Sequence, residues 1–482
     1  MKLDLDERYR PHYHFSPPAA WLNDPNGMVY YAGEYHLFYQ HYPDEITWGP
    51  MHWGHAVSRD LLHWEHLPIA LYPDEVGAIF SGSAVIDWQN RAGFGPAAMV
   101  ALFTHECNGR QMQSLAYSTD KGRTWSKYAG NPLIEPPAGI PNFRDPKVFW
   151  YARAGSGHWV MLLVAGDRVL FYTSPDLRQW ELASSFGPSY GATCGVWETP
   201  ELCELPVDGG PETRWLLSVA VGDCAPAGGS GVQYFVGAFD GVCFTSDNPP
   251  ATVLWADYGA DFYAPQGWNE TPDGRPIWLA WLSNWVYARE VPATTFRGTM
   301  TIPRELALKT TAAGVRLVQR PIRELAQLRG RHWQWAHEAI AGASDLLAAV
   351  SGQALEIIAE LAVAQPLPAE RLGLRVRNGG GEFTTIGYDV RQQRLFVDRT
   401  QSGQVDFNAA FPAVHSADLA PIDGCIRLHI FVDRCSLEVL ANDGLVAFTE
   451  QIFPDDASVG VELFSAGGSV MLTRLDIYAI TP

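Results

Sequence analysis

A chain of 482 residues is longer than one hydrophobic core usually supports, so two domains are expected. The composition is 47% hydrophobic and 12% aromatic, too apolar for a disordered chain, while apolar runs such as 159–165 are far shorter than the roughly 20 residues that cross a bilayer. A formal net charge of −19 would repel nucleic acid phosphates and anionic lipid, so we expect neutral small molecules such as sugars as partners, and neither nucleic acid nor membrane.

The N-terminus and the cysteines indicate a compartment. Residues 1–7 alternate charge with leucine and contain no apolar stretch or small-residue cleavage site, so no secretory signal is expected in the sequence as written. Seven scattered cysteines without CxxC pairs predict neither a disulfide framework nor a cysteine zinc site. We therefore expect a cytoplasmic location with free thiols, unless a signal was trimmed from the sequence.

Three similar segments recur in the first part of the chain, each after an apolar, strand-like run. They are Ser58-Arg59-Asp60 leading to Trp64, Ser118-Thr119-Asp120 leading to Trp125, and Ser174-Pro175-Asp176 leading to Trp180. The Asp positions are 60 and 56 residues apart, long enough for one four-stranded propeller blade, so about 300 residues make five blades. Ser and Asp side chains satisfy the backbone of tight turns, and we interpret the repeat as scaffold.

Residues 1–310 are expected to form an all-β, five-bladed β-propeller, because short aromatic-rich runs such as 35–39 and 278–282 are typical of strands. Residues 311–330 change character and include a short helix opened by Pro321, so they are expected to be a linker. Residues 331–482 return to strands, with a hairpin turn at 442–444, and predict a C-terminal β-sandwich.

Three carboxylates follow the blade period. Asp24, Asp145 and Glu198 are separated by 121 and 53 residues, close to two blades and one blade. Phe-Ser-Gly-Ser at 80–83 lies about one blade after Asp24, and Asp-Phe-Tyr-Ala at 261–264 about one blade after Glu198. If each motif sits on the innermost strand of its blade, all five converge at the propeller axis. Glycoside cleavage needs one ionised carboxylate and one protonated carboxyl, and a third carboxylate can stabilise the developing charge.

The neighbours of the two aspartates suggest their roles. Asn23 and Asn26 can hydrogen-bond Asp24 and favour its ionised form, which suits a nucleophile. The guanidinium of Arg144 can keep the adjoining Asp145 charged.

Glu198 is flanked by Trp197 and Pro200, and apolar surroundings with two anions nearby favour its protonated form, which suits a general acid. Taken singly, the three carboxylate motifs also fit simpler interpretations: a turn, an Arg–Asp ion pair and an exposed strand-end carboxylate. Their joint order and spacing favour catalysis.

Two histidine pairs, His52 with His55 and His63 with His66, invite a metal interpretation. Side chains three residues apart in a strand point to opposite faces, so a shared metal is not expected.

Four motifs, in their order along the chain, resemble those of glycoside hydrolase family 32. They are Trp-Leu-Asn-Asp-Pro-Asn-Gly at 21–27, Phe-Ser-Gly-Ser at 80–83, Phe-Arg-Asp-Pro at 143–146 and Trp-Glu-x-Pro at 197–200. The resemblance covers almost the whole chain and includes 459–465, which is similar to the sandwich domain of that family. It implies retaining hydrolysis of β-fructofuranosides without cofactor or metal, with Asp24 as nucleophile, Asp145 as transition-state stabiliser and Glu198 as acid/base.

The resemblance also implies a set of residues that bind the fructosyl unit, namely Asn23, Gln40, Trp48, Ser83 and Arg144. Three further candidates for sugar binding are the aromatic residues Phe80, Tyr263 and Trp285. Their rings can stack on a sugar or lie in one of the five motifs. One position departs from the family pattern. The family usually has a cysteine directly after the acid/base glutamate, and this chain has Thr199 there. We expect altered tuning of Glu198 there and retained activity, because the glutamate itself carries the proton.

Residues 228–231, 233–237 and 239–241 are similar to the exo-acting levanase and inulinase branch, which favours release of terminal fructose from sucrose, inulin or levan. A fructosyltransferase would share the fructosyl-enzyme intermediate. An inverting five-bladed glycosidase, a sialidase and a propeller that only binds carbohydrate are further alternatives, each less well matched by the motifs.

Overall fold

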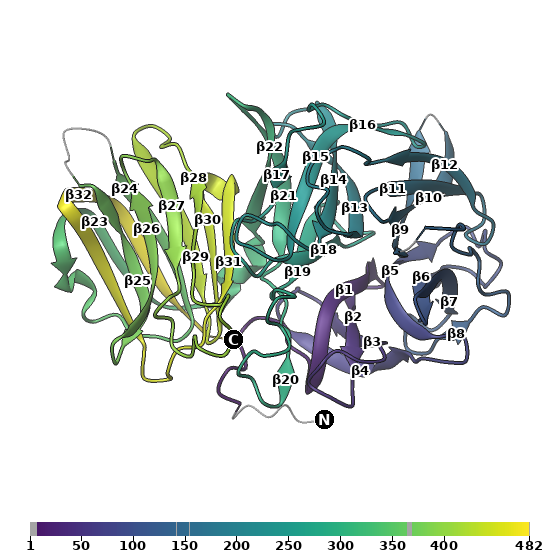
Figure 1. Ribbon diagram of the computed structural model, residues 1–482, viewed down its shortest axis with the longest axis horizontal. Helices are drawn as coiled ribbons and strands as arrows, with labels where there is room; N and C mark the ends of the chain where they lie inside the picture. Colours follow the sequence, from purple (N-terminus) through teal and green to yellow (C-terminus); the bar gives the residue numbers. More distant parts are fainter. Residues whose placement is uncertain (1–6, 141, 154, 364–368, 482) are drawn as a thin grey trace.

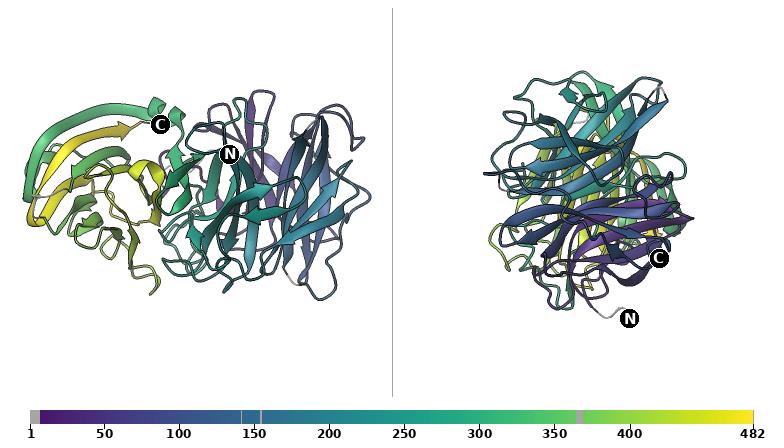
Figure 2. Two further views of the ribbon diagram at one scale, coloured as in Figure 1. Left: turned by 90° about the horizontal axis from the view of Figure 1, so that it is seen from above. Right: turned by 90° about the vertical axis from the view of Figure 1, so that its right-hand side faces the viewer.

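The computed structural model describes residues 7–140, 142–153, 155–363 and 369–481, which form two β-rich parts packed side by side (Figure 1). The left view of Figure 2 shows the curved layers of the C-terminal part beside the blades of the N-terminal part. Within these ranges the helical elements are three short 3₁₀ turns, η1 (Arg323–Leu328), η2 (Asp345–Leu347) and η3 (Asn442–Gly444). The expected all-β propeller and sandwich are confirmed. Residues 1–6, where no secretory signal is expected, lie outside the described ranges.

The propeller consists of five sheets, each built mainly of antiparallel strands. The first contains β1 (Ala20–Tyr31), β2 (Glu34–Tyr42), β3 (His52–Ser58) and β4 (Trp64–Leu71), and the second contains β5 (Ala78–Asp87), β6 (Ala98–Cys107), β7 (Arg110–Ser118) and β8 (Ser126–Lys127). The third contains β9 (Phe143–Arg153), β10 (Ser156–Ala165), β11 (Val169–Ser174) and β12 (Glu181–Phe186). The fourth contains β13 (Trp197–Pro206), β14 (Thr213–Val221), β15 (Gly231–Phe239), β16 (Phe244–Ser246) and β17 (Leu254–Trp255). The fifth contains β18 (Tyr263–Gly267), β19 (Ile277–Trp281), β21 (Arg304–Thr311) and β22 (Gly314–Pro321).

The first strand of each blade lies innermost. β1, β5, β9, β13 and β18 contact one another in that order, and β18 contacts β1, so they form a closed ring. β20 (Phe296–Arg297) pairs in parallel with β1, and the Tyr30 N–H donates to the Asn269 carbonyl at 2.8 Å, which ties the end of the propeller to its beginning. Aromatic side chains fill the space between blades, as where Trp53 meets Phe103, and each buried ring stabilises the fold by about 1.5–3 kcal/mol.

The Ser-x-Asp repeats lie in turns between the third and fourth strands of the first three blades. Each Asp carboxylate accepts hydrogen bonds from backbone N–H groups two to four residues later. The donors are Leu62 and His63 for Asp60, Arg123 and Thr124 for Asp120, and Arg178 and Gln179 for Asp176. These aspartates stabilise turns, as the sequence predicts.

The connection between the domains is shorter than the expected linker, 311–330. β22 pairs with β21 along its whole length and so belongs to the fifth blade. The connection is reduced to Ile322 and η1, and β23 begins directly after it at Arg329. The sequence misled here because Thr-Ala-Ala-Gly at 311–314, which resembles a linker, is the tight turn of a hairpin.

The C-terminal part is a folded-over sheet whose two layers share one long strand. Its strands are β23 (Arg329–Ser344), β24 (Leu355–Ala362), β25 (Arg371–Gly379), β26 (Glu382–Asp389), β27 (Arg394–Asp398), β28 (Val414–Asp418), β29 (Cys425–Val432), β30 (Ser436–Ala441), β31 (Val446–Gln451) and β32 (Gly460–Ile480). β32 pairs with β25 through its first residues and with β24 through its last, so it passes from one layer to the other. The predicted hairpin turn at 442–444 joins β30 to β31.

The expectation that all cysteines are free is wrong for one pair. Cys194 and Cys224 form a disulfide with a Cα–Cα distance of 6.4 Å. The register of the β13–β14 hairpin explains it: Trp197 pairs with Val221, so residues three positions beyond each end meet. The remaining cysteines, 107, 203, 243, 425 and 435, are free.

In the part of the chain that the structure describes, no helix has the length and apolar character needed to span a bilayer.

Candidate active site

The three predicted carboxylates meet in one pocket at the propeller axis. Asp24 lies on β1, Asp145 on β9 and Glu198 on β13, and the pocket has a volume of about 300 Å³. Its lining consists of Asn23, Asp24, Gln40, Trp48, Phe80, Ser81, Gln111, Asn142, Arg144, Asp145, Glu198, Trp285 and Arg289. The convergence expected from the blade period therefore holds for the carboxylates.

A local irregularity aims the functional side chains into this pocket. Each innermost strand breaks its pairing register where its motif lies: at 22–25, 79–82, 144–147, 198–201 and 263–266. Four of these bulges contain a proline, at positions 25, 146, 200 and 265. Asp145, Thr199 and Ala264, each directly before its proline, adopt positive φ of 61°, 43° and 51°. Bulges re-aim side chains and tolerate proline, so the recurring X-Pro is part of how the site is built.

Asp24 is buried, with 8% of its surface exposed. The Asn23 amide donates to its Oδ1 at 3.1 Å and the Ser81 hydroxyl to its Oδ2 at 2.6 Å. Burial raises the pKa of Asp24 to about 6; the Ser81 hydrogen bond opposes this rise, and the Glu198 carboxylate adds to it.

The expectation that Asn26 supports Asp24 is not met by the geometry. The Asn26 side-chain oxygen accepts from the Gly82 N–H at 3.3 Å instead. The bulge between Leu22 and Pro25 separates the two residues, and Ser81, from the next blade, supplies the second donor to Asp24.

Asp145 is also buried, and the Thr199 N–H donates to its Oδ2 at 2.9 Å. Burial raises the pKa of Asp145 to about 7; the Arg144 guanidinium opposes the rise, while the Glu198 and Asp24 carboxylates add to it. The Thr199 hydroxyl is buried without a hydrogen-bond partner among the described residues.

Glu198 has polar neighbours, which corrects the expected apolar surroundings. Arg144 donates to its Oε1 at 2.5 Å, and the Tyr263 hydroxyl donates to its Oε2. Burial and the Glu198 carboxylate raise the pKa of Tyr263, so this hydroxyl stays protonated as a donor. The expected apolar neighbour, Trp197, points to the other face of β13 and packs against Phe235, because side chains alternate along a strand.

Most of the predicted sugar-binding residues line the pocket, and two do not. The lining includes Asn23, Gln40, Trp48, Phe80, Arg144 and Trp285. Ser83 instead donates to the Pro146 carbonyl and accepts from the Val148 N–H, each at 2.8 Å, and so joins β5 to β9. Tyr263 reaches the site through its hydrogen bond to Glu198.

Four lining residues were not predicted as site residues: Ser81, Gln111, Asn142 and Arg289. Ser81 lies within a recognised motif, so position alone could have indicated it. Asn142 and Gln111 accept hydrogen bonds from Arg144 Nη1 at 2.8 and 3.3 Å and thereby orient its guanidinium. Gln111 and Arg289 stand in no motif, and only the fold brings them to the pocket.

Both parts of the chain match the two domains of one protein family. The description "Glycosyl hydrolases family 32 N-terminal domain" matches residues 14–321, and the C-terminal description of the same family matches 324–479. The chain belongs to glycosyl hydrolase family 32. This family 32 hydrolase is 54% identical to a levanase of Bacillus subtilis (strain 168), with 98% of this chain and 71% of the levanase aligned.

A second relative is an extracellular exo-inulinase of Aspergillus ficuum, 39% identical over 99% of this chain and 96% of the relative. The crystal structure of the exo-inulinase from Aspergillus awamori superimposes with a TM-score of 0.94 at 37% identity, covering 100% of this chain and 99% of that one. The family resemblance seen in the motifs is confirmed, and the chain is a glycoside hydrolase.

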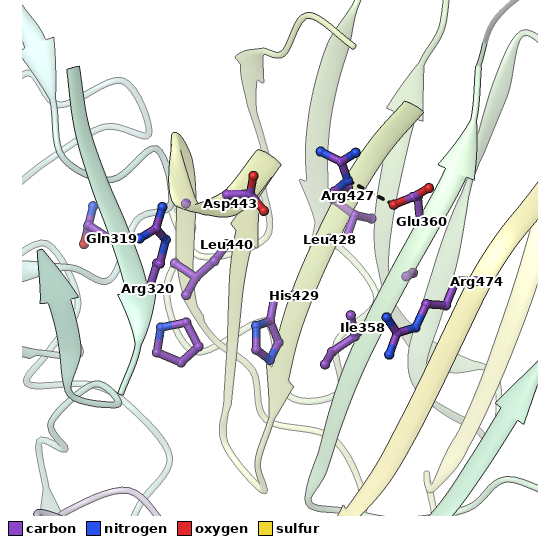
Figure 3. A pocket seen from close by; sticks show the side chains of 13 residues that line it. Gln319, Arg320, Ile358, Glu360, Arg427, Leu428, His429, Leu440, Asp443 and Arg474 are labelled. Carbon is purple, nitrogen blue, oxygen red and sulfur yellow. Dashed lines mark hydrogen bonds and ion pairs between the residues drawn. The ribbon is translucent and has the colours of Figure 1, made fainter. Parts of the chain in front are cut away.

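A larger cavity of this family 32 hydrolase, about 440 Å³, lies between the fifth blade and the sandwich (Figure 3). Its two lining carboxylates, Glu360 and Asp443, lie on opposite sides of Arg427 in that view, and Glu360 accepts from Arg427 at 2.9 Å. Two carboxylates line this cavity, whereas the axial pocket brings together three, which supply a nucleophile, an acid/base group and a charge-stabilising group. The axial pocket is the candidate active site.

The fifth motif divides between the site and the domain interface. Tyr263 serves the site, whereas Asp261 is fully buried and accepts from Arg399 of the sandwich at 2.7 Å. The expectation that Asp261 converges with the other motifs is therefore wrong, because it lies before the β18 strand and is engaged by the second domain.

Proposed function

We propose that this family 32 hydrolase is a retaining exo-β-fructosidase that removes terminal β-fructofuranosyl units from fructans and sucrose. The convergence of Asp24, Asp145 and Glu198 in one small pocket carries the proposal, because it joins two potential acid/base or nucleophilic groups with a third carboxylate. The family membership and the relatives named as levanase and exo-inulinase support the substrate class.

The reactive form of the enzyme carries a proton on Glu198 and none on Asp24. In the first step, an oxygen of Asp24 attacks the anomeric carbon of the terminal fructosyl unit while Glu198 gives that proton to the departing glycosidic oxygen. The bond to the leaving group breaks and a fructosyl ester of Asp24 forms. In the second step, Glu198 takes a proton from water, the water oxygen attacks the same carbon, and Asp24 leaves as a carboxylate. Two displacements at one carbon retain its configuration.

Asp145 is assigned the stabilisation of positive charge on the sugar ring in both transition states. Its carboxylate is held by the Thr199 N–H and does not need to move. Arg144 and Tyr263 hold both oxygens of Glu198, so the acid/base group is positioned before substrate binds.

Incubation with sucrose, inulin and levan, followed by product sizing, tests the proposal. Free fructose as the first product supports exo hydrolysis, and elongated oligosaccharides at high sucrose would instead indicate a fructosyltransferase. Repeating the reaction with added methanol tests retention: a retaining enzyme transfers the fructosyl unit to give the methyl β-fructofuranoside, and an inverting enzyme does not. The relative rates on inulin and levan decide the preferred linkage.

Two observations bear on the cellular location of the protein. The sequence predicts a cytoplasmic protein, while the Cys194–Cys224 disulfide favours an oxidising compartment and one relative is an extracellular enzyme. We propose secretion or export as the alternative to test by fractionating the source cells and assaying fructose release in each fraction.

A further inference from the structure

The loop between β19 and β20, residues 282–295, contributes two side chains to the active-site pocket. We name it the pocket loop; Trp285 and Arg289 are its lining residues. Between them lies Tyr287, which is 2% exposed and faces the other way. Its ring packs edge-on against Phe411 of the sandwich, with centroids 5.3 Å apart.

The Tyr287 hydroxyl is part of a buried network that crosses the domain boundary. It donates to Asp261 Oδ1 at 2.6 Å and accepts from Arg399 Nη2 at 2.9 Å. Arg399 also donates to Asp261 Oδ2 at 2.7 Å, pairs with Glu450 at 3.0 Å and lies over the Phe411 ring. Arg399 and Glu450 belong to the sandwich, so the second domain holds the middle of the pocket loop.

The pocket has a buried floor and an open mouth. Asn23, Asp24 and Gln40 form the floor and are 3%, 8% and 2% exposed. Trp48, which is 38% exposed, and the exposed Arg289 lie at the mouth, with Arg289 Cζ 6.0 Å from the centroid of the Trp48 ring. Attack by Asp24 requires the terminal fructosyl unit at the floor. The rest of the substrate must then leave through the mouth, past Arg289.

We propose that Arg399 is a positioning residue that, through Tyr287, sets the affinity of the site for the sugar on the leaving-group side of the scissile bond. Arg289 on the pocket loop hydrogen-bonds hydroxyl groups of that sugar. The inference rests on the proposed function, because it assumes that the fructosyl unit occupies the floor. It gives the sandwich domain a part in substrate selection.

The structure offers a matched control in a second interdomain network. The Thr449 hydroxyl donates to Asp257 Oδ2 at 2.7 Å and accepts from Arg304 Nη2 at 2.5 Å. Thr449 belongs to the sandwich and both of its partners to the propeller, so this hydroxyl, like that of Tyr287, bonds an arginine and an aspartate in a network that crosses the domain boundary. Neither Thr449 nor its two partners lines the active-site pocket.

The experiment compares Tyr287→Phe, Arg399→Lys, Arg289→Gln and Thr449→Val with the unaltered full chain. For each, KM and kcat are measured with sucrose and with a fructan trisaccharide, together with the inhibition constant of free fructose, which probes the floor alone. We expect Tyr287→Phe, Arg399→Lys and Arg289→Gln to raise KM for both substrates about five-fold, with kcat and the fructose constant within about two-fold. Thr449→Val should lower Tm without changing KM.

An equal KM for Tyr287→Phe and Thr449→Val would overturn the inference, since the network would then be structural only. The inference would also be overturned if Tyr287→Phe raised the inhibition constant of free fructose by the same factor as KM, because the floor of the pocket would then be affected too. Should Arg399→Lys fail to fold, Tyr287→Phe and Arg289→Gln still decide the matter. Absence of fructose release by the unaltered chain from sucrose, inulin and levan would refute the proposed function itself, which is a different result.

Discussion

Arg144 directs its guanidinium to Glu198 and not to its neighbour in sequence, Asp145. The Nη2 atom lies 2.5 Å from Glu198 Oε1, while Nε lies 3.8 Å from Asp145 Oδ2. One arginine therefore serves two carboxylates differently: it fixes the position of the acid/base group by a charge-assisted hydrogen bond and restrains the pKa of Asp145 by its charge.

Replacing Arg144 tests this double role. We expect Arg144→Gln to lower kcat/KM on sucrose by about 100-fold or more, because Glu198 loses its positioning partner and Asp145, with a further raised pKa, is less ionised. The acid limb of the pH profile should move to higher pH. Arg153→Gln is the control, since Arg153 forms an exposed ion pair with Glu204 at the far end of the same strand. Equal activity of the two variants would contradict the assignment.

The pH profile of the unaltered enzyme should reflect the raised pKa values of its aspartates. Asp24 attacks only when ionised, and its pKa is raised to about 6 by burial. Asp145, with a pKa raised to about 7, must also be ionised to stabilise positive charge. We expect kcat/KM to fall as pH decreases through this range, as a property of the coupled cluster. A flat profile between pH 7 and pH 5 would show that neither group governs the reaction.

Removing the Asp24 charge should abolish turnover and stabilise the fold. Asp24→Asn cannot form the fructosyl ester, so a loss of about 10⁴-fold or more is expected. The folded pKa of Asp24, about 6, lies above its ordinary value of 3.8, so ionisation costs stability as pH rises from about 4 to 6. The variant should then exceed the parent by about 1–3 kcal/mol at pH 7, and the difference should vanish near pH 4. Thermal unfolding at both pH values measures this.

The features that follow the blade repeat could be predicted from the sequence, whereas those that depend on how distant segments pack could not. The Ser-x-Asp turns and the spacing of Asp24, Asp145 and Glu198 follow from a repeat that each blade satisfies locally. Arg144 could not be paired correctly, because the bulge at 144–147 turns consecutive side chains away from each other.

Contacts between distant segments were beyond such patterns. Asp261 shares a motif with Tyr263, yet Arg399, 138 residues further on, takes it into the domain interface. Cys194 and Cys224 meet only because the hairpin register brings their loops together. Gln111 and Arg289 carry no motif and are brought to the pocket by the strands and loops around them.

The disulfide gives a direct chemical prediction. In denaturant without reductant, protein made in an oxidising compartment should show five reactive thiols, and after reduction it should show all seven. Cys194→Ser should show six thiols, since its loss frees Cys224. Seven thiols before reduction would show that the bond does not form.

Ser81 and Ser83 lie in one motif but have separate tasks, and substitution should separate them. The Ser81 hydroxyl donates to Asp24 and lowers its pKa, so Ser81→Ala should raise that pKa and move the acid limb of kcat/KM to higher pH. The Ser83 hydroxyl links the Pro146 carbonyl to the Val148 N–H, so Ser83→Ala leaves two buried backbone groups unsatisfied. That variant should lose about 1–3 kcal/mol of stability and keep the position of the acid limb. The contrary result would be an acid limb that shifts in Ser83→Ala and stays in place in Ser81→Ala. It would reverse the two assignments, because Ser83 would then be the hydrogen-bond donor to the nucleophile.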